Sequence, residues 1–315
     1  MFYLLLAGVF CFLYYKKIVE PADFSADNSI DRVITFHTWK PYQFRLLVPF
    51  IFVLLKPLSF IPQKTVFIVY DFIIVCFIID VFNKTLTQYI QNKKAILWLS
   101  PVILYPMLWN YIILNQGFQF YDFTSVLIFT IGIYFILKEK FTYLLIVFII
   151  GLVNKETIAY LGFAYVFFNY KKMFTKKIIL NVLLMSALFV VYKLILNYLF
   201  QNNAGSTVEI SYDANIYTIK QLPFNRIYQK DIFLNFGLLY VPVLLLFLTG
   251  RWKKHPDRRK VYVNLVFLPY LLFGIFIIYF SEIRVYAELI PGISTLFIIY
   301  LSAFDKLNLR PVEYV

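Results

Sequence analysis

Long, continuous runs of apolar residues dominate the chain, and short polar segments separate them. Because the runs are continuous rather than alternating, they predict α-helices and not the strands of a membrane β-barrel. Several reach the length of about 17–25 residues that a helix needs to cross a bilayer. We therefore predict an all-α, polytopic transmembrane protein. The apolar runs are residues 2–15, 46–61, 65–83, 95–114, 122–137, 141–153, 157–169, 178–200, 232–249, 261–280 and 287–304.

The composition favours a membrane protein over a soluble one. Of the 315 residues, 61% are hydrophobic, 21% are aromatic and only 15% are charged. The net charge of +13 could attract nucleic acid, but basic loops on the cytoplasmic side of a membrane explain it better, so we expect no nucleic-acid partner. Residues 1–17 have no basic residue before their apolar run and no clear cleavage site, which predicts a retained first helix.

The cysteines and histidines form no recognisable metal or disulfide pattern. Cys11 and Cys76 both lie in apolar segments. His37 and His255 lie in different loops, which we expect on opposite sides of the membrane. The sequence therefore predicts neither a disulfide framework nor a metal centre built from Cys and His.

The distribution of Lys and Arg predicts how the chain crosses the membrane. Residues 251–260 carry six basic side chains, and loops of this kind stay on the cytoplasmic side. Working outward from this loop gives about ten crossings with both termini inside, provided that residues 46–61 form a helix on the outer surface. Lys16 and Lys17 disagree, because they fall at the outer end of the first helix. The whole chain, 1–315, is then one membrane domain, with a first outer loop at 16–64 and a second at 201–231.

A polar turn interrupts the apolar pattern near the middle of the chain. Asn154, Lys155 and Glu156 separate the runs 141–153 and 157–169, each of which is too short to cross a bilayer comfortably. Ionisable groups at membrane depth are costly and usually mark a functional site. We therefore predict a broken helix pair over 141–169, whose turn is covered by protein or lines a cavity. A purely structural polar contact is the alternative.

Several polar segments share the outer side in this topology. Carboxylates beside Lys and Arg suit a phosphate-bearing substrate, because a carboxylate can take a proton from an acceptor hydroxyl while the cations stabilise a departing phosphate. Simpler interpretations also stand: a solvated acidic loop, a helix cap at Asp122, or a local pair between Glu288 and Arg284. The outer polar segments are residues 20–32, 39–45, 115–122, 154–156 and 281–288.

This layout resembles the GT-C class of integral-membrane glycosyltransferases. The resemblance covers nearly the whole chain, but each motif is short, and the first loop lacks the Asp-x-Asp or Asp-Glu pair of many members. The motifs are an acidic stretch from Glu20 to Asp31, an Arg-Leu-Leu-Val-Pro sequence from Arg45 to Pro49, a helix-opening Asp122, the Asn154–Glu156 turn, and a closing group of Glu282, Arg284, Glu288 and Pro291.

The resemblance implies transfer of a sugar from a polyprenyl-phosphate-linked donor to an envelope glycan, lipid or protein acceptor. The reaction would take place on the extracytoplasmic face of a bacterial inner membrane. A first-loop carboxylate would act as base, and the choice among Glu20, Asp23, Asp27 and Asp31 stays open, as does any use of a divalent metal. The candidate catalytic residues are Asp27, Asp31 and Glu156, and the candidate substrate-binding residues are Arg45, Asp122, Lys155, Glu282 and Arg284.

Two other functions stay open. A polymerase that joins lipid-linked repeat units would be expected to carry Arg-rich outer loops, whereas only Arg32, Arg45, Arg226 and Arg284 fall outside. A transporter or flippase of lipid-linked glycans often shows paired repeats and charges along a path through the membrane. No repeat is apparent here, and the charges gather on one side.

Overall fold

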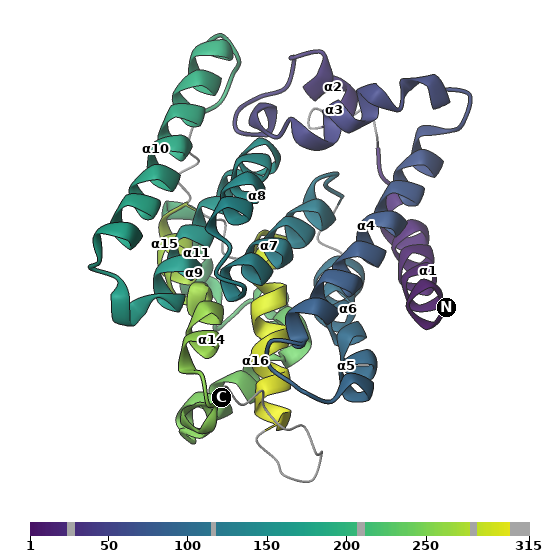
Figure 1. Ribbon diagram of the computed structural model, residues 1–315. Coiled ribbons are helices and arrows are strands. Elements are labelled where there is room, and N and C mark those ends of the chain that lie inside the picture. Colours follow the sequence, from purple (N-terminus) through teal and green to yellow (C-terminus); the bar gives the residue numbers. More distant parts are fainter. Residues whose placement is uncertain (24–28, 115–117, 207–211, 278–281, 303–315) are drawn as a thin grey trace.

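The computed structural model of the chain is a bundle of helices (Figure 1). It describes residues 1–23, 29–114, 118–206, 212–277 and 282–302, and within these ranges the regular structure is helical, without strands. The predicted all-α class is therefore confirmed. The α-helices are α1 (Phe2–Tyr14), α2 (Ile30–Ile34), α3 (Leu47–Leu54), α4 (Gln63–Leu86), α5 (Lys93–Leu99), α6 (Leu104–Met107), α7 (Asp122–Leu137), α8 (Phe141–Asn154), α9 (Tyr160–Phe168), α10 (Lys176–Leu199), α11 (Tyr212–Gln221), α12 (Arg226–Phe233), α13 (Tyr240–Leu248), α14 (Arg258–Tyr262), α15 (Phe267–Ile277) and α16 (Ile290–Ser302).

Five helical segments of the described chain are long and apolar enough to cross a membrane. At 1.5 Å per residue, the 24-residue helices α4 and α10 are about 36 Å long, which covers a hydrocarbon core of about 30 Å. The helices α7 and α8 and the segment 156–168 are apolar but shorter. The five long segments are residues 2–19, 63–86, 93–113, 176–199 and 285–302.

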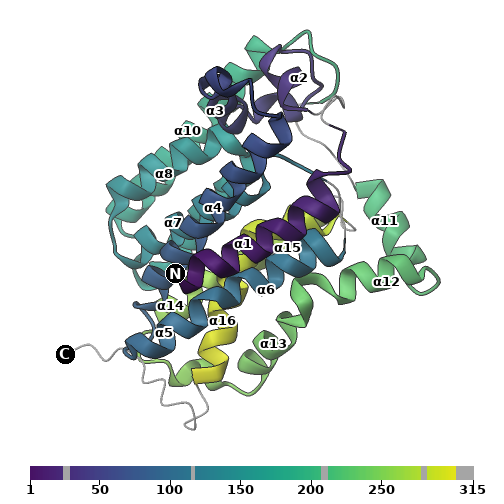
Figure 2. The ribbon, with the colours of Figure 1, turned by 90° about the vertical axis from the view of Figure 1, so that its right-hand side faces the viewer.

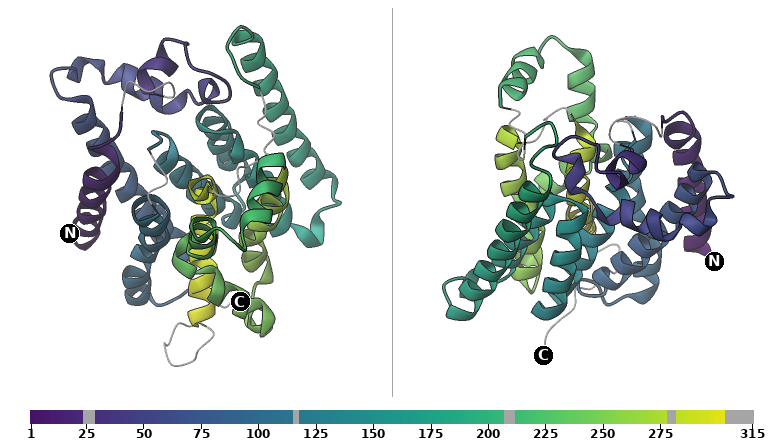
Figure 3. Two further views of the ribbon diagram at one scale, coloured as in Figure 1. Left: turned by 180° about the vertical axis from the view of Figure 1, so that it is seen from behind. Right: turned by 90° about the horizontal axis from the view of Figure 1, so that it is seen from above.

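The helices at the edge of the bundle expose apolar side chains. Only 11% of the most apolar stretch of α10 is buried, compared with 72% for the segment 285–302, which contains α16. Seen from the front and from above, α1 and α10 lie at opposite edges of the bundle (Figures 1 and 3). Exposed Leu183, Val191 and Leu194 on α10 are unfavourable in water but suit contact with lipid. The outer helices are thus compatible with a membrane protein.

Glycines allow the central helices to approach closely. Helix α7 packs between α4 and α8. A Cβ atom on Gly151 of α8 would lie 2.4 Å from Cγ1 of the buried Ile158 and 3.0 Å from Cγ2 of Ile128. These distances are shorter than van der Waals contact, so a side chain at residue 151 would force Ile158, in the turn that follows α8, to shift.

One end of the bundle is covered by short helices from residues 29–58, which we call the cap (Figures 1 and 2). The apolar run 46–61 forms α3 and the single turn η3 (Lys56–Leu58) rather than a long span. The segment after α10 holds the cap in place, because the Lys40 N–H donates to Ala204 O at 2.8 Å and Asn203 Nδ2 donates to Thr38 O at 2.7 Å. Helices α11 and α12 lie on the side of the bundle away from α8 and α10 (Figure 2).

We expect Gly151→Ala to destabilise the protein by about 1–3 kcal/mol, because the added methyl group overpacks the contact with Ile158. Gly162→Ala is the matched control, since nothing lies within 4 Å of its Cβ position and alanine favours a helix by about 0.5–1 kcal/mol over glycine. Thermal unfolding of the two purified variants in detergent checks the prediction. Equal midpoints for both variants would contradict it.

Candidate ionic site at the helix break

The chain breaks its helix where the polar turn interrupts the apolar pattern. Helix α8 ends at Asn154, and Lys155 takes an extended conformation (φ −164°, ψ 139°) before the single turn η6 (Glu156–Ala159) leads into α9. Asn154 fixes the turn to α7, because its Nδ2 donates to Ser125 Oγ at 2.8 Å. The predicted broken helix pair over 141–169 is therefore present in the structure.

A buried ion pair stabilises the break. Lys155 Nζ lies 2.7 Å from Glu288 Oε1, and the two side chains are only 6% and 1% exposed. Glu288 belongs to the turn η11 (Ile283–Leu289) and also accepts from Thr157 Oγ1 at 2.8 Å and from Tyr270 OH at 2.9 Å. Lys155 is thus a partner of Glu288 that the sequence did not suggest, and the alternative pair of Glu288 with Arg284 involves a side chain outside the described residues. A carboxylate that is buried this deeply needs such a set of partners.

Arg45 reaches the same region from the cap. Its Nη1 donates to Tyr121 OH, and its Nη2 lies 3.5 Å from Glu156 Oε1. The guanidinium carbon lies 4.3 Å from the ring centroid of Tyr121 and 4.6 Å from that of Tyr42. Burial alone would lower the pKa of Arg45, but the neighbouring Tyr121 and Glu156 outweigh this effect and raise the pKa, so the guanidinium stays charged.

Two more charged groups complete the site. Glu156 is 28% exposed, which makes it the most accessible of the paired carboxylates here. Lys193 of α10 interacts electrostatically with Glu156, and its Nζ lies 4.8 Å from the ring centroid of Phe44. Sequence reasoning missed Lys193, although a single lysine within the apolar run 178–200 is itself a signal of function. Lys155 Nζ lies 5.6 Å from the Tyr121 ring, so both Lys155 and Arg45 contact this ring.

The structure brings four of the predicted residues together: Arg45, Asp122, Lys155 and Glu156. Asp122 is buried at the first position of α7, directly after Tyr121. Glu282 is partly exposed and precedes η11, the turn that carries Glu288. Thus the ionic site combines residues from the cap, α7, the helix break and η11, with Lys193 from α10.

The remaining predicted residues lie elsewhere or outside the described chain. Asp31 is exposed on α2, where its Oδ1 accepts from Gln63 Nε2 at 3.3 Å. It lines a cavity of about 460 Å³ between α2, α3, η3 and the start of α4. Asp27 and the side chain of Arg284 lie outside the described residues.

An apolar pocket of about 410 Å³ lies beside the ionic site. Residues of η8 (Asn235–Leu238), α13 and α16 line it, together with Tyr286 and Leu289 of η11. The Tyr286 ring centroid is 5.9 Å from that of Tyr270, whose hydroxyl donates to Glu288. Tyr270 therefore contacts both the Tyr286 ring of the pocket wall and the carboxylate of the buried ion pair.

Among the described residues, no group of three or more His, Cys, Asp and Glu side chains is placed to hold a metal ion. Asp122 does interact electrostatically with the buried Asp71 of α4. Two carboxylates alone do not define a metal site, because divalent cations bound to protein usually take more oxygen ligands.

No family model, curated protein or solved structure matches this chain. We therefore infer the function from the geometry of the site and from the chemistry of its residues.

We expect Glu288→Leu to destabilise the protein by about 3–5 kcal/mol, because it leaves Lys155 buried without its partner. The double variant Lys155→Met/Glu288→Leu should recover most of this loss, since both charges are then absent. The exposed pair Lys84–Asp80, also separated by 2.7 Å but 57% and 52% exposed, is the control and should contribute less than about 1 kcal/mol. Thermal unfolding of all variants gives the comparison, and a double variant no more stable than Glu288→Leu would contradict the coupling.

Proposed function

We propose that this protein is an integral-membrane glycosyltransferase that uses a polyprenyl-phosphate-linked sugar. The main support is the ionic site beside an apolar pocket: Lys155 and Arg45 flank Tyr121, and Tyr270 links the pair Lys155–Glu288 to the pocket wall. A donor with a phosphate and a long hydrocarbon chain requires both environments next to each other. In this proposal the lipid chain occupies the pocket and the phosphate lies near Tyr121.

The transfer would proceed by displacement at the anomeric carbon of the donor sugar. The acceptor hydroxyl oxygen bonds to this carbon, a carboxylate takes the hydroxyl proton, and the bond to the phosphate oxygen breaks with its electron pair on the phosphate. Arg45 and Lys155 stabilise the charge on the departing polyprenyl phosphate. Glu156, Asp122 and Glu282 would position these cations or the acceptor, and Arg284 is a further candidate for holding the donor phosphate.

Asp31 or Asp27 would act as the base, and Asp31 is the one of these two that the structure describes. Asp31 lines the cavity of about 460 Å³ in the cap, where an acceptor could enter. Gln43 links its helix to the segment that carries Arg45, because Gln43 Nε2 donates to Val33 O at 3.0 Å and Gln43 Oε1 accepts from the Thr38 N–H at 3.3 Å. The cap thus holds the candidate base and a candidate phosphate ligand in one unit.

We also propose in which membrane the protein lies and how its chain crosses that membrane. The protein would lie in the inner membrane of a bacterium as a single domain with about ten crossings and both termini in the cytoplasm. The cap and the ionic site would face the outside. The acceptor would be a glycan, a lipid or a protein of the cell envelope, and a repeat-unit polymerase or a flippase of lipid-linked glycans remains the alternative function.

We expect Arg45→Gln to lower sugar transfer about 100-fold or more, because it removes a charge that stabilises the leaving phosphate. The assay follows label from a purified polyprenyl-phosphate-linked donor into an added acceptor, without a membrane gradient. Lys220→Gln is the control, since Lys220 is an exposed cation of α11 and should keep full activity. Movement of donor across vesicles without transfer would support the flippase instead, and full activity of Arg45→Gln would refute the role of Arg45.

We expect single cysteines at positions 31 and 253 to be accessible from opposite sides of the membrane. Both native residues are exposed, and the background would be Cys11→Ser/Cys76→Ser. A membrane-impermeant thiol reagent should label position 31 in intact cells and position 253 only after permeabilisation. Labelling of both positions from the same side would contradict the proposed topology.

A further inference from the structure

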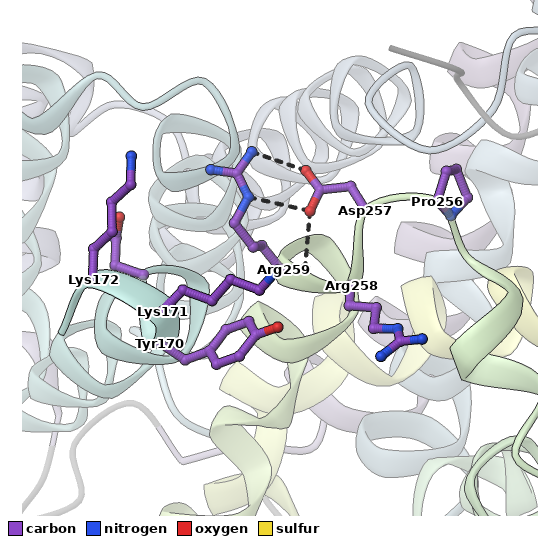
Figure 4. Close-up of a pocket in the computed structure, with 8 residues that line it drawn as sticks. Tyr170, Lys171, Lys172, Pro256, Asp257, Arg258 and Arg259 are labelled. Atoms are coloured by element: carbon purple, nitrogen blue, oxygen red, sulfur yellow. Dashed lines mark hydrogen bonds and ion pairs between the residues drawn. The ribbon is translucent and has the colours of Figure 1, made fainter.

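A basic pocket is lined by residues that follow α9 and residues around the start of α14 (Figure 4). The helix α14 lies away from the cap (Figure 1). The pocket has a volume of about 480 Å³ and lies between the end of α9 and the start of α14. The turn η7 (Tyr170–Lys172) forms one wall, and residues 256–259 form the other. Its lining residues are Asn169, Tyr170, Lys171, Lys172, Pro256, Asp257, Arg258 and Arg259.

The only carboxylate among these lining residues is already neutralised. Arg259 Nη2 lies 3.0 Å from Asp257 Oδ2, and Arg259 Nε donates to Asp257 Oδ1 at 3.2 Å. Arg259 Nη1 also lies 3.2 Å from Glu139 Oε1. Figure 4 shows the two parallel contacts between Arg259 and Asp257. Arg259 therefore connects residues of the pocket wall, and Asp257 and Glu139 balance its charge.

The other three cations of the pocket are Lys171, Lys172 and Arg258, and all three are exposed. Within the described part of the chain, no carboxylate lies within 4.0 Å of any of them. Figure 4 shows Lys171 extending from η7 towards α14. The pocket thus presents three positive charges without a carboxylate partner among the residues that the structure describes.

Aromatic rings lie beside two of these cations, Lys171 and Arg258. The ring centroids of Tyr170 and Tyr262 are 4.7 Å apart, and those of Trp252 and Tyr262 are 5.5 Å apart. The guanidinium carbon of Arg258 lies 5.9 Å from the centroid of Trp252. Trp and Tyr side chains of membrane proteins gather at the depth of the lipid headgroups, so this cluster favours a position of the pocket at that depth.

We propose that this pocket binds the phosphate group of an anionic phospholipid headgroup. Lysine ammonium groups and an arginine guanidinium are strong donors to phosphate oxygens, and basic pockets between membrane helices on the cytoplasmic side recognise lipid headgroups of this kind. Soluble phosphate shares this chemistry, but the aromatic cluster and the adjoining end of the apolar helix α9 favour a ligand that resides in the membrane. No residue of the ionic site takes part, so this inference does not depend on the proposed glycosyl transfer.

The test compares two variants that lose the same number of charges. In the pocket variant, Lys171→Gln, Lys172→Gln and Arg258→Gln are combined. In the control, Lys93→Gln, Lys94→Gln and Lys138→Gln remove three exposed cations that do not line the pocket. Binding of dioctanoyl phosphatidylglycerol to the full-length protein in neutral detergent is measured for each, with dioctanoyl phosphatidylcholine and inorganic phosphate as comparison ligands. Lys172→Glu is the second pocket variant, for use if the triple variant does not fold.

We expect the pocket variant to bind phosphatidylglycerol on the order of tenfold to a hundredfold more weakly than the wild type. The control should bind it within about twofold of the wild type, and phosphatidylcholine should bind weakly to all three proteins. Equal losses in the pocket variant and the control would overturn the proposal, because attraction would then be a property of the whole face. Binding of inorganic phosphate as tight as that of the lipid would overturn it in favour of a soluble ligand.

Discussion

The buried ion pair between Lys155 and Glu288 is the constraint on which the centre of this protein depends. Two charges removed from water are stable only if each finds its partner and the remaining lone pairs are bonded. Here Thr157 and Tyr270 supply those bonds, so the helix break, η11 and α15 must meet at one point. The pair thereby fixes the relative positions of segments that are more than a hundred residues apart in the chain.

The helix break also determines where the cap lies. A helix that ends inside a membrane protein leaves carbonyl groups without intrahelical partners. The carbonyl of Val153 accepts from the Leu46 N–H at 2.8 Å, so the cap supplies a partner that water would supply in a soluble protein. This bond brings Arg45, the neighbouring residue, onto Tyr121 and Glu156. The polar turn, the cap and the ionic site are therefore parts of one arrangement.

The helical class and the position of the helix break at Asn154–Glu156 could be predicted from the sequence. Both follow from local properties, namely the length of the apolar runs and the cost of burying charge. The sequence also indicated that Arg45, Asp122, Lys155 and Glu156 share one region, since all lie on the same side in the predicted topology. It did not identify the partner of Glu288 or the role of Lys193. These depend on the rotation of η11 and α10 about their axes, which neighbouring helices determine. The number of crossings stays a prediction, because α13 and α15 are too short to decide it from length alone.

Helix α10 brings Lys193 to the ionic site, although little of its surface packs against the rest of the protein. Its buried contacts near the cap involve Leu196 and the adjacent Phe200, which pack on Phe44. Further along the helix, Asn181 Nδ2 donates to Tyr165 OH at 2.7 Å and Met185 is buried in the main core, so α10 is attached along its length. Other side chains of α10, such as Val191 and Leu194, are exposed. One helix thus carries both a cation of the ionic site and an apolar surface suited to lipid, so only the width of α10 separates these two environments.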